Sequence, residues 1–285
     1  MLRIAICLVL AGSIAVAAEP THRDIEYATV DGRRLLLDIY QPANVKAAPL
    51  VIWVHGGAWR AGSKSSVPIA HLLQHQNAIA SVDYRLSPVA KFPAQIHDIK
   101  AAIRFLRANA GKYNVAPDRF IIAGASAGGH LAALVGVSNG VKELEGELGD
   151  HVGTSSDVQK IVSFYGASNL QTILSQSTPH GLRVRVPALQ LLLGGQPDEK
   201  AELAKLASPV AHVDKDDPPL MLIHGDRDPQ MPIEQAHELH ARYKKLGRPV
   251  QFEIIRGGVH GGRGFYEDEA IDRLAAYLEN DAEAE

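Results

Sequence analysis

The sequence predicts an α/β domain in which helices cover both faces of a doubly wound, mostly parallel sheet of about eight strands. Short runs rich in apolar and β-branched residues alternate along the chain with amphipathic stretches of helical spacing. Several of the apolar runs are continuous, as expected for strands buried on both faces. No internal repeat or long linker divides the 285 residues, so we expect one large domain.

The expected strands form an N-terminal hairpin followed by a series of core strands. Asp31-Gly32 is a two-residue hairpin signal between strands expected at Ile25 to Val30 and Arg34 to Tyr40. The core strands are expected at Leu50 to Val54, Ala78 to Asp83, Phe120 to Gly124, Ile161 to Tyr165, Leu220 to His224 and Val250 to Ile255.

Helices are expected between these strands. They are placed at Pro93 to Arg107, Gly128 to Val137, Glu234 to Leu246 and Glu267 to Leu278. Residues 170–210 have no regular pattern, apart from helical pieces expected around Pro187 to Leu193 and Glu199 to Ala207. We expect this segment to be a small cap or insertion.

The N-terminus has the pattern of a secretory signal peptide. Arg3 precedes an apolar run from Ile4 to Leu10, and small residues continue up to Glu19. We expect a signal peptide at residues 1–18, a mature domain at 19–285, and a secreted or periplasmic protein without a membrane anchor; an uncleaved anchor is the alternative. Cys7 is the only cysteine, so the mature chain would have no disulfide and no thiolate chemistry.

The composition excludes several classes of function. A net charge of −3, with acids and bases interspersed, provides no basic stripe for nucleic acid and no polybasic cluster for a membrane surface. The 13 histidines are scattered without the spacing of metal ligands, so we expect no metal and no cofactor. His71 and His75 are expected on a solvated helix face.

Residues 124–128 read Gly-Ala-Ser-Ala-Gly and contain the expected nucleophile, Ser126. The motif follows an apolar strand and precedes a helix, so the serine lies in a tight strand-to-helix turn that bulkier flanking residues would not fit. The turn raises the hydroxyl above the sheet at the N-terminus of the helix, whose dipole favours developing negative charge.

A serine hydroxyl needs a base to accept its proton and a carboxylate to orient that base. His260 lies among glycines directly after the strand ending at Ile255, and is the expected base. Asp226 and Asp228 both follow the strand ending at His224. We assign the acid to Asp228, which lies further out in the loop, and expect Asp226 to brace the loop by binding nearby N–H groups.

Residues 55–59 read His-Gly-Gly-Ala-Trp directly after a buried strand. Successive small residues expose backbone N–H groups, which acyl-transfer enzymes direct at the oxyanion of the tetrahedral intermediate. We assign the donors to Gly57, Ala58 and Ala127, the residue after the nucleophile. His55 is expected to be structural, and Trp59 to shape the substrate pocket together with residues 170–210.

These motifs together resemble the BD-FAE group of the α/β-hydrolase fold (bacterial feruloyl esterase-like), near the hormone-sensitive-lipase type of carboxylesterase. The resemblance covers nearly the whole mature chain and also includes the segments 83–86 and 92–98. It implies that Asp228 is the acid and that Asp83, Arg85 and Asp98 brace the interior. The chain departs from the hormone-sensitive-lipase pattern in two respects: Ala58 replaces a third glycine, and the long N-terminal cap is missing, which implies a more open site.

We therefore predict a secreted carboxylic ester hydrolase (a serine carboxylesterase) with a Ser-His-Asp triad and an acyl-enzyme intermediate. Its expected substrates are small esters or acetyl and feruloyl esters linked to hemicellulose; the sequence does not predict the acyl group or the oligomeric state. The alternative enzyme is an amidase, such as an arylformamidase-like hydrolase of the same fold. The alternative of a different class is a non-catalytic binding module built on a hydrolase domain.

Overall fold

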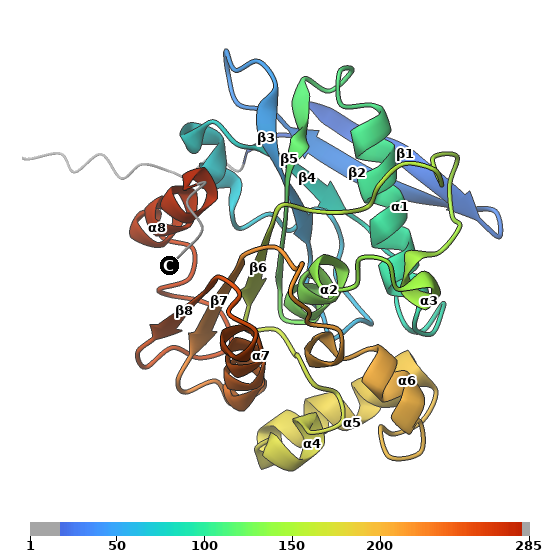
Figure 1. Ribbon diagram of the computed structural model, residues 1–285, viewed down its shortest axis with the longest axis vertical. Coiled ribbons are helices and arrows are strands. Elements are labelled where there is room, and N and C mark those ends of the chain that lie inside the picture. The colour runs from blue at the N-terminus through green and yellow to red at the C-terminus, as the bar shows by residue number, and fades with distance from the viewer. Residues whose placement is uncertain (1–17, 281–285) are drawn as a thin grey trace, which may run out of the picture.

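The computed structural model describes residues 18–280. The predicted signal peptide lies almost entirely outside these residues. Eight strands form one sheet in the order β1-β2-β4-β3-β5-β6-β7-β8 (Figure 1). β1 pairs with β2 and β2 with β4 in antiparallel fashion, whereas all other neighbours are parallel. The predicted eight-stranded, mostly parallel sheet is confirmed.

Each predicted strand is present, and its ends differ from the prediction by at most three residues, except that β5 begins at Val115 rather than Phe120. The strands are β1 (His22–Val30), β2 (Arg33–Tyr40), β3 (Ala48–Val54), β4 (Ala78–Val82), β5 (Val115–Ala125), β6 (Lys160–Phe164), β7 (Leu220–Gly225) and β8 (Val250–Ile255). Asp31 and Gly32 join β1 to β2 with φ values of 51° and 73°. Positive φ at both residues is what a tight two-residue hairpin turn needs.

Along the chain, the helices lie between the strands, and the last helix follows the last strand. The longer ones are α1 (Ala94–Ala108), α2 (Ala127–Gly136), α5 (Pro179–Leu193), α7 (Glu234–Lys245) and α8 (Asp268–Glu279). The short ones are η1 (Ala70–His75), α3 (Lys142–Glu145), α4 (Ile173–Gln176), α6 (Ala201–Leu206) and η2 (Pro209–Ala211). The sequence pattern did not predict α3, α4 or η2, because each is too short to show a helical period; at η1 it predicted only a helix face with His71 and His75.

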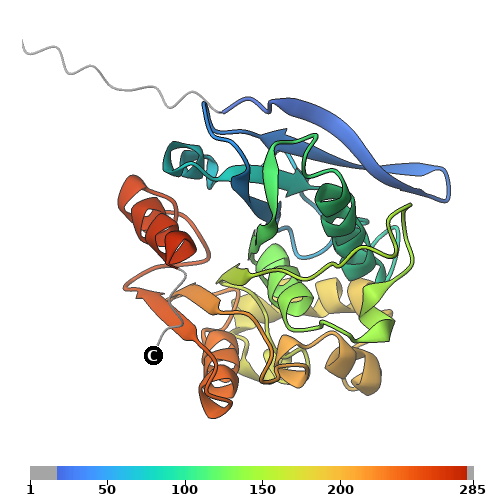
Figure 2. The same cartoon turned by 45° about the horizontal axis from the view of Figure 1, so that its top comes forward.

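The alternation of side chains along each strand divides the core into two layers. In β3, Leu50 and Ile52 face a core that they share with α1, α2 and α7. Val51 and Trp53 face the other core, which is covered by η1 and α8. Figure 2 shows η1 and α8 on one side of the sheet, with α1 and α2 on the other. This is the doubly wound arrangement, and both faces of the sheet are buried.

Helix α5 begins earlier than the sequence suggested, at Pro179 rather than near Pro187. The Thr178 side chain caps its N-terminus by accepting a hydrogen bond of 3.0 Å from the N–H of Gly181. The helix continues through Pro187. Because proline has no N–H, the carbonyl of Arg183 loses its helical hydrogen bond. Both residues lie on the exposed side of the helix. Water can solvate that carbonyl, so the proline does not end the helix.

The two histidines expected on a solvated helix face lie on η1 with partly exposed side chains, and each also pairs with an aspartate. η1 packs beside α8, so that the Nδ1 of His71 lies 2.7 Å from Asp268 and the Nε2 of His75 lies 3.1 Å from Asp272.

No helix in residues 18–280 is both long and apolar enough to span a membrane.

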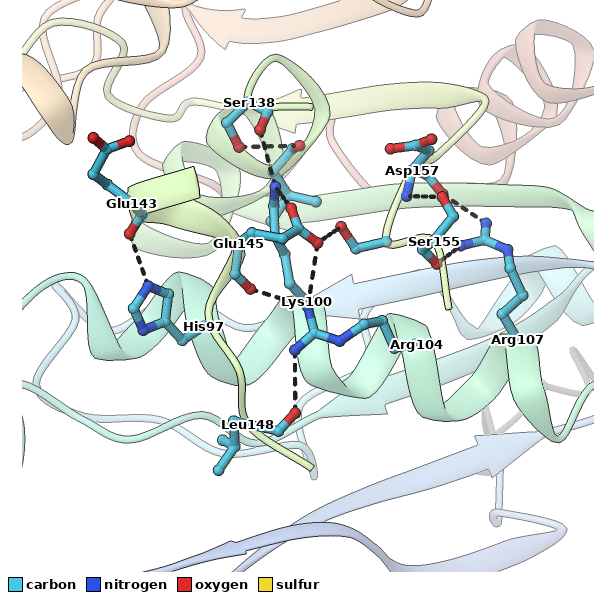
Figure 3. A network of polar contacts seen from close by, with 12 residues as sticks. His97, Lys100, Arg104, Arg107, Ser138, Glu143, Glu145, Leu148, Ser155 and Asp157 are labelled. Carbon is cyan, nitrogen blue, oxygen red and sulfur yellow. Dashed lines mark hydrogen bonds and ion pairs between the residues drawn. The ribbon is translucent and has the colours of Figure 1, made fainter. Parts of the chain in front are cut away.

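A buried ionic network fastens the segment after α2 to helix α1 (Figure 3). Lys100 and Arg104, both on α1, approach the Glu145 carboxylate at 2.7 and 3.2 Å. The Arg104 guanidinium also donates to the carbonyls of Glu145 and Leu148. This cluster holds the irregular chain between α2 and β6 against the helix layer.

Candidate active site

Ser126 lies at the end of β5, where the chain turns sharply into α2. Its φ of 56° and ψ of −116° are strained for a residue with a side chain. A Cβ at Gly124 would collide with the Gly128 carbonyl, and one at Gly128 would collide with the Val54 carbonyl. The flanking glycines therefore allow the turn to pack against β3, as the sequence predicted.

Three side chains from separate loops form one hydrogen-bonded chain. The Nε2 of His260 lies 2.8 Å from the Ser126 Oγ, and its Nδ1 lies 2.6 Å from the Asp228 Oδ2. These distances are within the range needed for proton transfer between a nucleophile and its base. The structure thus brings together the three residues that were named from the sequence.

The loop after β7 separates the roles of its two aspartates. Asp226 accepts a hydrogen bond of 2.6 Å from the N–H of Gly257, and so braces the loop that carries His260. The other carboxylate oxygen of Asp228 accepts hydrogen bonds from the N–H groups of Gln230 and Met231, at 2.8 and 2.9 Å. Asp226 therefore positions the loop, whereas Asp228 faces the imidazole.

The environment of Asp228 keeps it ionised. Burial by itself would raise the pKa of this carboxyl group, but the hydrogen bonds from His224 and His260 and the positive charge of His260 hold it well below its usual range. An ionised carboxylate at this place stabilises a positive charge on His260.

The loop after β3 presents backbone N–H groups beside Ser126. Gly57 and Ala58 have φ values of 114° and 52°, and the Gly57 carbonyl accepts hydrogen bonds from the N–H groups of Arg60 and Ala61. Within residues 18–280, the N–H groups of Gly57 and Ala58 are not used in backbone hydrogen bonds. Ala127 is the first residue of α2, so its N–H has no acceptor in the preceding turn.

His55 lies beneath this loop and is 2% exposed. Its ring stacks on Tyr84 with 4.5 Å between the ring centres, and its Nδ1 lies 2.7 Å from the Gly56 carbonyl. Burial lowers the pKa of His55. These contacts fit the structural role that the sequence suggested. Asp98 likewise braces the interior, because it forms a two-point ion pair with Arg85.

A cavity of about 650 Å³ opens at Ser126 and His260. Aromatic rings of Trp53, Tyr165 and Tyr266 line part of it. Helix α5, from the predicted cap segment, contributes Val184 and Arg185. The sequence reasoning missed these residues. Tyr165 follows β6 directly, so its position at a strand end could have indicated it, whereas no sequence pattern indicates Arg185.

Trp59 requires a correction, because the sequence placed it in the substrate pocket. Its indole is 0% exposed and does not line the cavity. The indole N–H donates a hydrogen bond of 3.0 Å to the Nδ1 of His130, and the Nε2 of His130 lies 2.7 Å from the Ala207 carbonyl. The left-handed backbone at Trp59, with φ of 59°, turns the side chain inward. The ring anchors the loop 55–59 to the protein interior.

Among residues 18–280, no group of three or more His, Cys, Asp or Glu side chains is arranged to hold a metal ion.

The sheet order, the strained serine turn and the Ser-His-Asp chain define a protein of the α/β-hydrolase fold. The BD-FAE family profile matches residues 37–243. The chain belongs to the BD-FAE family.

Curated relatives of the chain include esterases. The chain is 34% identical to Esterase LipC of Mycobacterium tuberculosis over 232 residues, which are 79% of this chain and 56% of LipC. The chain spans only a little over half the length of LipC and of two further relatives from the same organism, Esterase LipQ and the probable carboxylic ester hydrolase LipM, at 56%, 53% and 53%.

Two solved structures are similar over nearly their whole length. A truncated carbohydrate esterase from gut microbiota superimposes with a TM-score of 0.82 at 34% identity, covering 90% of this chain and 94% of that one. The acetyl ester-xyloside bifunctional hydrolase of Caldicellulosiruptor lactoaceticus has a TM-score of 0.73 at 25% identity, with coverage of 91% and 96%. The predicted α/β-hydrolase fold is therefore confirmed.

Proposed function

We propose that this protein is a secreted carboxylic ester hydrolase that uses Ser126, His260 and Asp228 as a catalytic triad. The observation that carries the proposal is the continuous hydrogen-bonded chain from the Ser126 hydroxyl through His260 to Asp228. Acyl transfer also needs a space for the substrate and donors for the oxyanion. The cavity at Ser126 provides the space, and the backbone N–H groups beside it provide the donors.

In the acylation step, the Nε2 of His260 accepts the Ser126 proton while Oγ attacks the ester carbonyl carbon. The N–H groups of Gly57, Ala58 and Ala127 stabilise the oxyanion of the tetrahedral intermediate, and Asp228 stabilises the imidazolium ion. His260 then donates its proton to the leaving alcohol, and the acyl group stays on Ser126.

Hydrolysis of this acyl-enzyme restores the site. His260 accepts a proton from water, the hydroxide attacks the acyl carbon, and the second tetrahedral intermediate collapses. The proton returns to the Ser126 oxygen as the carboxylic acid leaves. In both steps Ser126 and His260 exchange the protons and Ser126 forms the covalent bond, while Asp228 and the oxyanion donors act through hydrogen bonds and charge.

The proposed substrates are small esters and acetyl or feruloyl esters linked to hemicellulose. The similarity to a carbohydrate esterase and to an acetyl ester-xyloside hydrolase supports carbohydrate-linked esters. Tyr266, which is half-buried and lines the cavity beside the buried Trp53 and Tyr165, supplies an apolar face on which a sugar or an aromatic acyl group can stack.

Export rests on the N-terminal sequence pattern. We propose cleavage before Glu19, which would release residues 19–285 as the mature protein. N-terminal sequencing of protein recovered from the periplasm or medium of a Gram-negative host tests this. A cytoplasmic protein that retains Met1 would contradict it.

The ester hydrolase proposal is tested with p-nitrophenyl acetate, butyrate and octanoate, with methyl ferulate, and with p-nitroacetanilide as the amide. We expect turnover of at least the short esters without added metal, and a loss on the order of 10⁴-fold or more in kcat for Ser126→Ala. Preferential turnover of the anilide would support the amidase alternative. A correctly folded protein without activity on any of them would support a binding module.

A further inference from the structure

Arg185 is a buried cation at the cavity with almost no partners. Its side chain comes from α5 and lines the cavity, although the residue is 1% exposed. Within residues 18–280, its terminal nitrogens Nη1 and Nη2 have no hydrogen-bond acceptor. Its Nε–H donates a long hydrogen bond of 3.4 Å to the Gln230 carbonyl, and its guanidinium lies 6.0 Å from the centre of the Trp59 ring.

Such an arrangement disfavours the folded state. A buried guanidinium without hydrogen-bonded counterions loses its hydration and receives little in return. Burial lowers the pKa of Arg185 to about 10, so the side chain still carries its charge at neutral pH. A purely structural residue would have its N–H groups satisfied by the protein, as Arg85 does with Asp98.

The charged side chains at the cavity are of one sign. Arg60 and Arg185 line it, and none of its described lining residues is Asp or Glu. Asp228, whose charge acts on Arg185, is already engaged by His260 and by two backbone N–H groups. The lining of the cavity therefore carries two positive charges and no carboxylate, and the Asp228 carboxylate that acts on Arg185 does not hydrogen-bond to it.

We propose that Arg185, assisted by Arg60 at the exposed side of the cavity, binds a carboxylate group of the substrate. The preferred substrates are then esters with a negative charge near the scissile bond. A guanidinium ion presents parallel N–H donors that match the two oxygens of a carboxylate. This inference rests on the proposed ester hydrolysis and adds the chemical class of its substrate.

The carboxylate could belong to either half of the ester, and two matched pairs of substrates distinguish the halves. On the acyl side, p-nitrophenyl hydrogen succinate is compared with p-nitrophenyl butyrate. On the alcohol side, 4-acetoxybenzoate is compared with its methyl ester. For each pair, the ratio of kcat/KM for the charged ester to that for the neutral ester measures the selectivity for charge.

We expect Arg185→Met to lower this ratio by about 10-fold or more in one of the two pairs, since hydrogen bonds to a charged group contribute strongly to binding. The pair that responds identifies the half that bears the carboxylate. Arg60→Met should lower the same ratio less, because Arg60 is exposed. Arg183→Met is the matched control: it removes a positive charge from the exposed side of α5, away from the cavity lining, and should leave both ratios unchanged.

A second measurement does not depend on turnover. In Ser126→Ala protein, glutarate should raise the Tm, whereas its uncharged isostere glutaramide should not. The double variant with Arg185→Met should lose the response to glutarate. Its Tm without ligand should be equal or higher, because the substitution removes an unpaired buried charge.

Three results would overturn the proposal: selectivity for charge that Arg185→Met leaves unchanged, an equal loss with charged and neutral esters, or a response to glutarate that persists without Arg185. If no ester is hydrolysed but glutarate binding depends on Arg185, the carboxylate site stands and the proposed esterase function fails. If neutral esters are hydrolysed and glutarate does not bind, the esterase stands and the carboxylate site fails.

Discussion

Trp59, His130 and the Ala207 carbonyl form a buried chain of hydrogen bonds beneath the active-site loop. Since the indole N–H donates to the Nδ1 of His130, the proton of the neutral imidazole is on Nε2, which donates to Ala207. Burial lowers the pKa of His130 to about 4, in agreement with a neutral ring. The chain connects loop 55–59 to α2 and to the end of the cap segment.

Trp59→Phe should therefore destabilise the protein by about 1–3 kcal/mol, because it leaves the buried Nδ1 of His130 without a donor. His130→Leu alone should be similarly destabilising, and the double variant should cost less than the sum of the two. Urea denaturation of the four proteins gives the coupling energy, which we expect to be on the order of 1 kcal/mol. Strictly additive effects would contradict this account of the chain.

At the scale of elements, the Glu145 carboxylate compensates the charge of two buried cations on helix α1. Lys100 and Arg104 are 0% and 1% exposed, and both pair with this carboxylate, which is 36% exposed (Figure 3). Removing the carboxylate would leave two positive charges buried beside each other. The energetic cost is smaller than for a fully buried pair, because water reaches Glu145.

Glu145→Gln should lower the free energy of unfolding by about 1–3 kcal/mol. Glu143→Gln is the matched control from the same short helix: the Glu143 side chain is exposed, so its neutralisation should change stability by less than about 0.5 kcal/mol. Chemical denaturation of both variants checks the prediction. Equal effects of the two substitutions would show that the network does not stabilise α1.

The elements that could be predicted from sequence are those whose pattern follows from their burial. A strand buried on both faces, such as β3 or β5, is a continuous apolar run, and the Asp31-Gly32 turn needs positive φ. α5 was only partly predicted, because Pro187 suggests a helix start unless tertiary structure leaves it on an exposed face.

At the scale of the whole molecule, the triad and the oxyanion loop could be predicted because each lies directly after a strand. Parallel strands bring their carboxyl ends to one edge of the sheet, so residues far apart in sequence, such as Ser126 and His260, meet there. The inward turn of Trp59 and the approach of Arg185 depend on backbone conformation and on packing between segments, neither of which has a period in the sequence.

Asp217 makes the stability of the molecule depend on pH. It is 3% exposed, and burial, together with the charge of Asp214, raises its pKa to about 7. The folded state therefore binds a proton that the unfolded state releases near pH 4. The contribution of this bound proton to the free energy of unfolding is complete below pH 4 and is lost as the pH rises through 7.

Asp217→Asn should consequently raise the Tm more at pH 8 than at pH 5, because the amide keeps an acceptor for the N–H of Asp214 without becoming charged. Differential scanning calorimetry at both values measures the difference. A gain that is the same at pH 5 and pH 8 would show that the carboxyl group does not titrate in this range.

The central claim is that Ser126 is the nucleophile of an ester hydrolase. The most direct test is intact mass spectrometry after reaction with a p-nitrophenyl alkylphosphonate, followed by peptide mapping. We predict one phosphonyl adduct per chain, located on Ser126, released p-nitrophenol in equal amount, and no adduct with Ser126→Ala. Labelling of another residue, or adduct formation that survives Ser126→Ala, would contradict the account.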